Sequence, residues 1–190
     1  MSIGQDGGVG EYVAFLRAIN LGKNRKFPMA ELRALLEREG FDGVETYIQT
    51  GNVRLRSALR SPQRLATRLE ELFEADRGFA VPTVVLTPGE LRQVYVDAQE
   101  LAPPPHLESA ELRRYVTLLK DDPPVDVVTE IESLELDGEA ARVRGRAVHV
   151  WVRDGYQNAR LSNTRIERSL GVATTRDLKV VTTLAERWGT

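Results

Sequence analysis

The sequence contains no cysteine, only two histidines and 6% aromatic residues. The lack of cysteine excludes disulfides, thiolate metal sites and a cysteine nucleophile, and it fits a reducing, cytoplasmic location. His106 and His149 lie far apart, without suitably spaced serine or carboxylate partners. We therefore predict no metal, no cofactor and no particular catalytic residue. No apolar run approaches the roughly 20 residues that span a bilayer, so a membrane partner is not expected.

Charge of both signs is present and nearly balanced, but it is segregated along the chain. The formal net charge is -2, which gives no overall reason to expect binding to nucleic acid. Residues 17–26 and 142–153 each carry basic residues without an acidic one, whereas residues 121–139 carry acidic residues without a basic one. Any electrostatic partner must therefore be recognised locally.

The first half of the chain predicts an α/β plait. Residues 12–16 form an apolar strand, Pro28 begins a helix that ends at Gly40, and two short strands meet at Gly51-Asn52. Ser61 caps a second helix, and a fourth strand follows at residues 83–86. This order, βαββαβ over residues 11–88, is that of a ferredoxin-like fold.

The second half predicts a similar but incomplete unit. We expect a flexible leader at residues 1–10, and a helix with a stiff, extended Pro-rich linker at residues 89–111. Residues 112–190 then follow the order βαββα, with a helix over residues 158–170. A helix at residues 176–188 takes the place of a last strand. The fold class is therefore α+β, with two ferredoxin-like halves, the second incomplete and closed by C-terminal helices.

One candidate site follows from plait topology. The loop after the first strand and the hairpin between the second and third strands lie at the same end of the sheet. This arrangement predicts a cluster of cations and amides that could bind a phosphate or another anion above a helix N-terminus. The interpretation that these polar groups only satisfy loop backbone is favoured by about two to one. The candidate ligand-binding residues here are Arg17, Asn20, Lys23, Arg25, Lys26, Gln49 and Asn52.

Two further regions carry basic residues. His149 and Trp151 share a strand face with nearby arginines, a pattern that could bind single-stranded nucleic acid, but a half-exposed structural strand is favoured. Near the C-terminus, Thr174 or Thr175 is expected to cap the last helix. Basic residues there could add an anion-binding face, although helix packing explains the pattern more simply: Arg160, Arg165, Arg168, Arg176 and Lys179.

Several segments resemble a known family. FLRAIN, PMAELRALLE and TYIQTGNV in the first half, and RGRAVHVWVRDG and LGVATTRD in the second, are similar to the bacterial domain of unknown function 1697. The resemblance implies paired plait-like halves and no activity. It adds Thr175 and Arg176 to the candidate ligand-binding residues. Asp177, where the family commonly has asparagine, would repel an anion at that helix N-terminus.

The sequence leaves the function open. Our leading hypothesis is a non-catalytic or regulatory module that binds an anionic ligand, either a phosphate-bearing metabolite or nucleic acid, through residues 17–26 and 49–52. The alternatives are an enzyme on a small polar substrate, and a protein-interaction or oligomerisation module. Whether the protein is an enzyme, and its oligomeric state, are not determined by the sequence.

Overall fold

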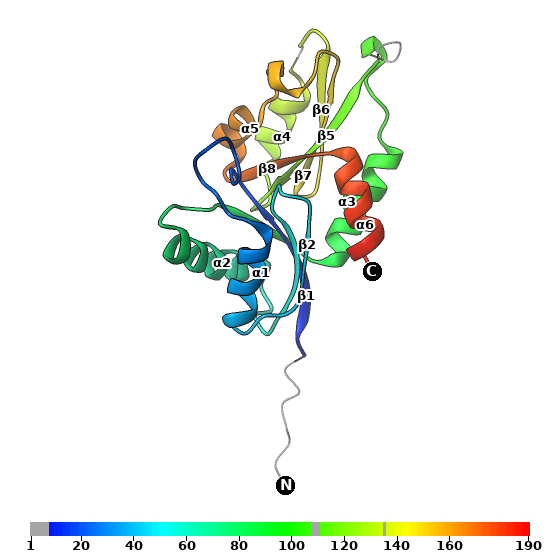
Figure 1. Ribbon diagram of the computed structural model, residues 1–190. Helices are drawn as coiled ribbons and strands as arrows, with labels where there is room; N and C mark the ends of the chain where they lie inside the picture. The colour runs from blue at the N-terminus through cyan, green and yellow to red at the C-terminus, as the bar shows by residue number, and fades with distance from the viewer. Residues whose placement is uncertain (1–7, 108–110, 135) are drawn as a thin grey trace. The chain divides into compact units, whose positions relative to one another are not determined.

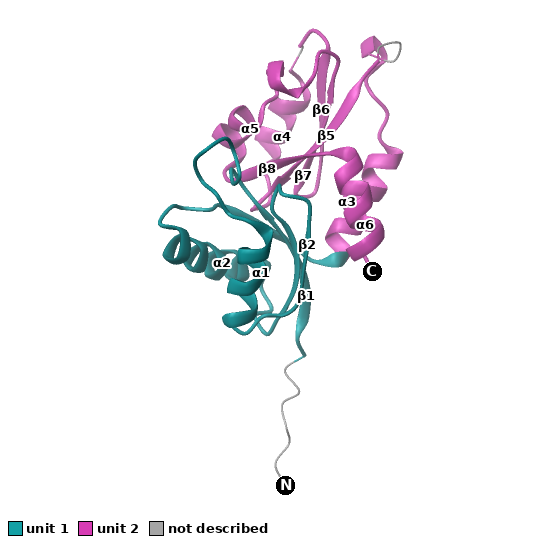
Figure 2. Ribbon diagram, in the orientation of Figure 1, with its two compact units in different colours: residues 1–88 teal, residues 89–190 magenta. Residues whose placement is uncertain are grey.

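The chain divides into two compact units, residues 1–88 and residues 89–190 (Figure 2). The computed structural model describes residues 8–107, 111–134 and 136–190. Most of the expected flexible leader lies outside the described residues, and Gly10 already belongs to the first strand. Among the described residues, no helix has the length and apolar character needed to cross a membrane.

The first unit is a four-stranded antiparallel sheet with two helices. The strand order is β2-β3-β1-β4, with every neighbouring pair antiparallel (Figure 1). The predicted ferredoxin-like order is confirmed. The elements are β1 (Gly10–Leu16), α1 (Met29–Arg38), β2 (Asp42–Tyr47), β3 (Asn52–Ser57), α2 (Pro62–Arg77) and β4 (Thr83–Leu86).

Both helices of this unit present apolar residues to the same core. The Ser61 hydroxyl accepts the N–H of Arg64 at the start of α2, and Gly78 ends the helix in a left-handed conformation with φ 73°. Helix α1 contributes Leu32 and Leu36 to the core. Phe27, just before α1, meets Phe73 of α2 edge to face with ring centroids 5.4 Å apart.

The second unit repeats the same topology. Its sheet has the order β6-β7-β5-β8, again antiparallel throughout. Figure 1 shows α4 and α5 on one side of this sheet and α3 and α6 on the other. The elements are α3 (Pro88–Glu100), the 3-10 turn η1 (Pro105–Leu107), β5 (Arg113–Leu119), α4 (Val125–Glu132), β6 (Glu139–Arg144), β7 (Ala147–Val152), the 3-10 turn η2 (Tyr156–Asn158), α5 (Asn163–Leu170), β8 (Ala173–Asp177) and α6 (Leu178–Trp188).

The expectation that the second half lacks its last strand is wrong. Strand β8 pairs with β5, with Thr175 opposite Thr117, and completes the βαββαβ order before α6 is added. The cap of the last helix is also not Thr174 or Thr175. Asp177 is the N-cap, and its carboxylate accepts the N–H of Lys179 at 2.8 Å. The segment is short and polar, so it lacks the apolar alternation of a typical strand.

Three smaller expectations also change. The helix expected from residue 158 begins at Asn163, capped by Ser162, because a 3-10 turn precedes it. The Pro-rich linker is not fully extended, since η1 begins at Pro105. Strand β7 is buried along its whole length and is not half-exposed, because helices cover both faces of its sheet.

Candidate anion-binding sites

The structure brings the first loop and the first hairpin together, as the topology predicts. The N–H of Leu16, at the end of β1, donates to the carbonyl of Gly51 at 2.8 Å. The side-chain amide of Asn20 donates to the carbonyl of Gln49 at 2.9 Å. Gly51 has φ 78°, and a Cβ there would lie 2.7 Å from the Cβ of Leu16. A residue other than glycine would therefore push the hairpin away from the loop.

The amide side chains at this end of the sheet are used to hold the backbone. Asn20 donates to the carbonyls of Phe27 and Gln49, both at 2.9 Å, and accepts the N–H of Phe27 at 2.8 Å. Asn52 is fully buried and donates to the Tyr47 carbonyl and the Thr50 hydroxyl, both at 3.0 Å. These bonds explain the two asparagines as parts of the scaffold.

Arg25 is also committed to the fold. Its Nε donates to the carbonyl of Ala18 and its Nη2 to the carbonyl of Ala80, both at 2.6 Å. Its guanidinium lies 4.7 Å from the ring centroid of Phe79. The loop needs this support because Ala18, Asn20 and Arg25 all have positive φ, which is costly for residues other than glycine.

The remaining predicted residues of the loop and hairpin differ in exposure. Lys23, Lys26 and Gln49 are exposed, and neither lysine forms an ion pair with a described residue. Arg17 follows β1 and is half-buried, and its N–H donates to the Pro82 carbonyl at 2.8 Å. The accessible positive charge of this loop is thus concentrated in two lysines.

Thr175 and Arg176 lie within the second unit, not at a helix start. The Thr175 hydroxyl is 2.8 Å from the hydroxyls of Thr117 and Tyr156, and it donates to the Asn163 amide oxygen at 3.0 Å. Arg176 is buried and donates to the Thr174 hydroxyl at 2.8 Å. Burial lowers the pKa of Arg176 to about 10 and raises that of Tyr156. This network holds β5, β8 and α5 together.

The possible nucleic-acid face on β7 is buried. His149 and Trp151 are each 1% exposed, so neither ring can stack on a base. Burial lowers the pKa of His149 to about 4. Arg146 is also buried and donates to Glu90 at 2.7 Å and to the Lys120 carbonyl at 2.9 Å.

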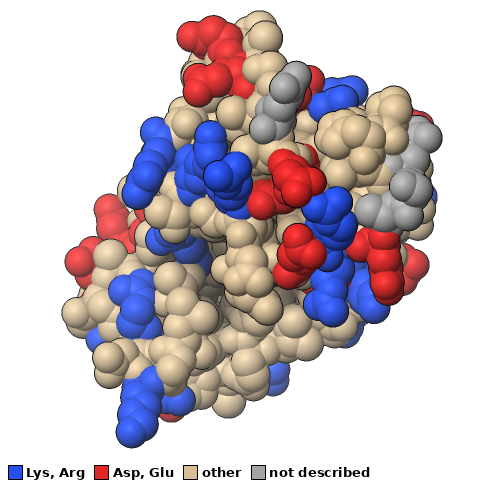
Figure 3. All heavy atoms as spheres, turned by 90° about the horizontal axis from the view of Figure 1, so that it is seen from above, with Lys and Arg blue, Asp and Glu red and all other residues tan. Residues whose placement is uncertain are grey.

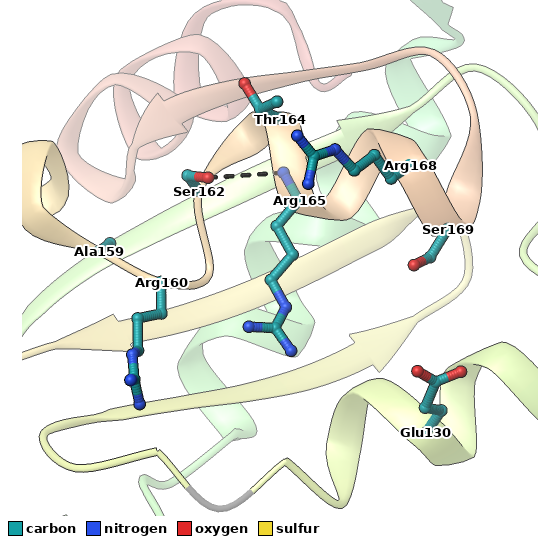
Figure 4. A pocket seen from close by; sticks show the side chains of 8 residues that line it. All are labelled: Glu130, Ala159, Arg160, Ser162, Thr164, Arg165, Arg168 and Ser169. Carbon is teal, nitrogen blue, oxygen red and sulfur yellow. Dashed lines mark hydrogen bonds between the residues drawn. The ribbon is translucent and has the colours of Figure 1, made fainter.

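A third group of basic residues surrounds an open pocket of about 570 Å³ in the second unit (Figure 4). Figure 4 shows the side chains of Arg160 and Arg165 extending in the same direction, with Glu130 of α4 across the depression. We call this the arginine pocket. It is lined by Glu130, Ala159, Arg160, Ser162, Thr164, Arg165, Arg168 and Ser169.

The segment that carries these arginines is fixed by a buried carboxylate. Glu139, at the start of β6, is 6% exposed and accepts the N–H groups of Arg160 and Leu161, both at 2.7 Å. The Ser162 hydroxyl then accepts the N–H of Arg165 at 3.4 Å. The backbone is therefore held in place, while the arginine side chains extend from it. Sequence reasoning missed Glu139 because it lies at the end of a run of acidic residues.

The guanidinium groups of the pocket differ from that of Arg25. Arg160, Arg165 and Arg168 are exposed, and none hydrogen-bonds or pairs with another side chain in the described part of the protein. Arg165 and Arg168 are three positions apart on α5, so they are neighbours on one helix surface and repel each other. In Figure 3, acidic and basic side chains both reach the surface in groups. A bound anion would offset the repulsion between Arg165 and Arg168.

Comparison with known proteins identifies the family. A family model described as "Protein of unknown function (DUF1697)" matches residues 9–149. The chain belongs to the DUF1697 family. A solved structure, described as that of the conserved bacterial protein SP0830 from Streptococcus pneumoniae, is also similar. It shares 25% identity with a TM-score of 0.67, over 96% of this chain and 100% of that one. No curated protein matches.

The DUF1697 match and the structural match differ in how much of the candidate sites they cover. The family model includes the first loop, the hairpin and Glu130, but it ends before the arginines of the pocket. The SP0830 structure extends the likeness over nearly the whole chain and supports the α+β fold with two ferredoxin-like halves. Neither comparison carries a function. In this DUF1697 protein, no cluster of three or more metal-ligating His, Cys, Asp or Glu residues occurs among the described residues.

Proposed function

We propose that this protein is a non-catalytic binding module for a phosphate-bearing anionic ligand, which binds in the arginine pocket. The carrying observation is that Arg160, Arg165 and Arg168 line one depression while their guanidinium groups have no partner among the described side chains. Guanidinium groups bind phosphate through paired, charge-assisted hydrogen bonds. The location that best fits the cysteine-free sequence is the cytoplasm.

The first loop has a smaller part in this proposal. Asn20, Asn52 and Arg25 already hold backbone groups, so a ligand there would meet mainly Lys23, Lys26 and Gln49. Exposed lysines bind phosphate as point charges and without fixed geometry. We therefore assign the loop a secondary, electrostatic contribution.

The first experiment measures binding of phosphate groups from two sources. Fluorescence anisotropy of a labelled single-stranded RNA, and calorimetry with inorganic pyrophosphate, are carried out with the wild type and the Arg165→Ala/Arg168→Ala variant. Loss of two charge-assisted contacts is expected to weaken binding at least about tenfold. The control is Arg60→Ala/Arg64→Ala, which removes two exposed arginines of the first unit that form no ion pair with a described residue.

The outcomes separate the possibilities. Weaker binding in the pocket variant alone supports the arginine pocket, and the probe that binds identifies the source of the phosphate. Equal losses in the pocket variant and the control would show unspecific electrostatic attraction. No binding of either probe at low salt would overturn the proposal. A Lys23→Ala/Lys26→Ala variant measures how much the loop contributes to binding. It is preferable to a variant that also changes Arg25, since Arg25 supports the loop backbone.

A further inference from the structure

Two exposed surfaces carry charge that the fold does not neutralise. The first, the basic tip, consists of Leu21, Lys23, Lys26 and Ile48 in the first unit. Leu21 and Ile48 flank the hydrogen bond between Asn20 and Gln49, so loop and hairpin together form this tip. The second, the acidic patch, consists of Asp121, Asp122, Val125 and Asp126 around the start of α4.

Elsewhere, many charges are balanced locally. Arg54 pairs with Glu11 at 2.8 Å, Arg77 with Glu31 at 2.6 Å, and Arg153 with Asp137 at 2.8 Å. The lysines of the basic tip and the aspartates of the acidic patch form no such pair within the described part of the chain. Asp126 has a local role, because a carboxylate in the first turn favours the positive helix end. Asp121 and Asp122 precede the helix and add charge beyond it.

Both surfaces also expose apolar side chains. Leu21 is 64% exposed, Ile48 is 43% exposed and Val125 is 82% exposed. Ile48 has φ 49°, a backbone conformation that is unfavourable for a β-branched residue. Single exposed apolar residues are common on protein surfaces, so these side chains only add to a match that rests on the complementary charges.

We propose that the basic tip of one molecule binds the acidic patch of a second copy of this chain. The two surfaces match in kind, with cations against carboxylates and apolar side chains at both. Nucleic acid would match only the lysines and would leave the acidic patch without a partner. Because the contact joins two different surfaces, it is heterologous and produces rings or open chains of molecules.

The association is weak and depends on salt. Exposed ion pairs typically contribute less than about 1 kcal/mol each, and they are screened at high ionic strength. We expect reversible assembly at low salt and protein concentrations up to about 1 mM, corresponding to a modest association free energy. The mass measured by analytical ultracentrifugation should rise with concentration at low salt and fall to that of the monomer at high salt.

A charge exchange gives the decisive test. Variant A carries Lys23→Glu/Lys26→Glu, and variant B carries Asp121→Lys/Asp122→Lys. In each variant alone the tip and the patch have charge of the same sign, so each is expected to remain monomeric at low salt. A 1:1 mixture should associate again, because the patch of A meets the tip of B with the native charges. The control, Arg60→Glu/Arg64→Glu, should associate like the wild type.

Each outcome decides the proposal. A wild type that stays monomeric at low salt and about 1 mM would overturn it, as would association that persists in variants A and B. A mixture of A and B that stays monomeric, although each is folded by circular dichroism, would show that these surfaces do not meet. All variants keep Arg160, Arg165 and Arg168, so the test does not depend on the arginine pocket.

Discussion

Arg25, in the first loop, and Arg165, in the first turn of α5, are both basic residues, yet they have opposite relations to the fold. Arg25 donates to two backbone carbonyls and lies against Phe79, whereas the guanidinium of Arg165 has no partner among the described residues. The difference lies in the backbone around them. Near Arg25, the carbonyls of the left-handed Ala18 and of Ala80 accept from its guanidinium, whereas the segment before Arg165 is held by Glu139. A basic side chain near a candidate site therefore indicates a ligand only when its hydrogen bonds within the protein are known.

The largest effect is expected from removing the loop's central amide. Asn20→Ala loses three hydrogen bonds to backbone groups, so unfolding free energy should fall by about 3 to 4 kcal/mol. Urea unfolding of the variant against Lys23→Ala, which removes an exposed side chain, gives the measurement. A loss no greater than that of the lysine variant would mean that the amide does not hold the loop.

A second prediction concerns a buried group that has no bonding partner. Both ring nitrogens of His149 are buried without a hydrogen bond to any described residue, and burial lowers its pKa to about 4. In the unfolded chain His149 takes up a proton near pH 6.5, whereas in the folded protein it stays neutral down to about pH 4. Stability therefore falls as the pH drops through this interval.

The size of this effect is isolated by a variant. The stability of the wild type should fall by about 3 kcal/mol more than that of His149→Leu between pH 7 and pH 4. Denaturant unfolding at a series of pH values measures it. Parallel curves for the two proteins would show that His149 is not the titrating group.

The third prediction tests the two arginines directly. Arg25→Ala should lower unfolding free energy by about 2 kcal/mol, because two carbonyls lose a charged donor. Arg165→Ala should change it by less than about 0.5 kcal/mol, as expected for an exposed side chain without a partner. Thermal unfolding of both variants provides the comparison, and similar losses would contradict it.

The smallest expected effect is a gain in stability. Ile48→Asn places a residue that tolerates the left-handed conformation at φ 49°, so it should stabilise the protein by about 1 kcal/mol. Ile48→Val keeps the β-branch and should bring no gain. Chemical denaturation of both variants distinguishes relief of backbone strain from a simple loss of exposed apolar surface.

Much of the fold was readable from the sequence, because apolar periodicity, proline starts and glycine stops locate most elements. The first unit follows these signals closely. Strand β8 does not, since its residues Thr174 and Arg176 are polar yet buried, and their burial depends on pairing with β5. Helix α5 begins later than the sequence predicts, because the 3-10 turn before it has no distinct sequence pattern.

The candidate site was less predictable. The contact between loop and hairpin follows from the topology. The hydrogen bonds of Asn20 and Arg25 to the backbone depend on left-handed conformations that residue type alone does not predict. The arginines near α5 were visible as charges. Their shared pocket depends on Glu139, which lies 21 residues before Arg160 and binds its N–H.

Strand β8 passes directly into helix α6, with no residue between them. Asp177 is both the last residue of the strand and the cap of the helix, so strand pairing and helix orientation are set by one residue. Inserting a single alanine after Asp177 would turn α6 by about 100°, away from the sheet face it covers. The direction of the last helix is therefore tied to the pairing of β8 with β5.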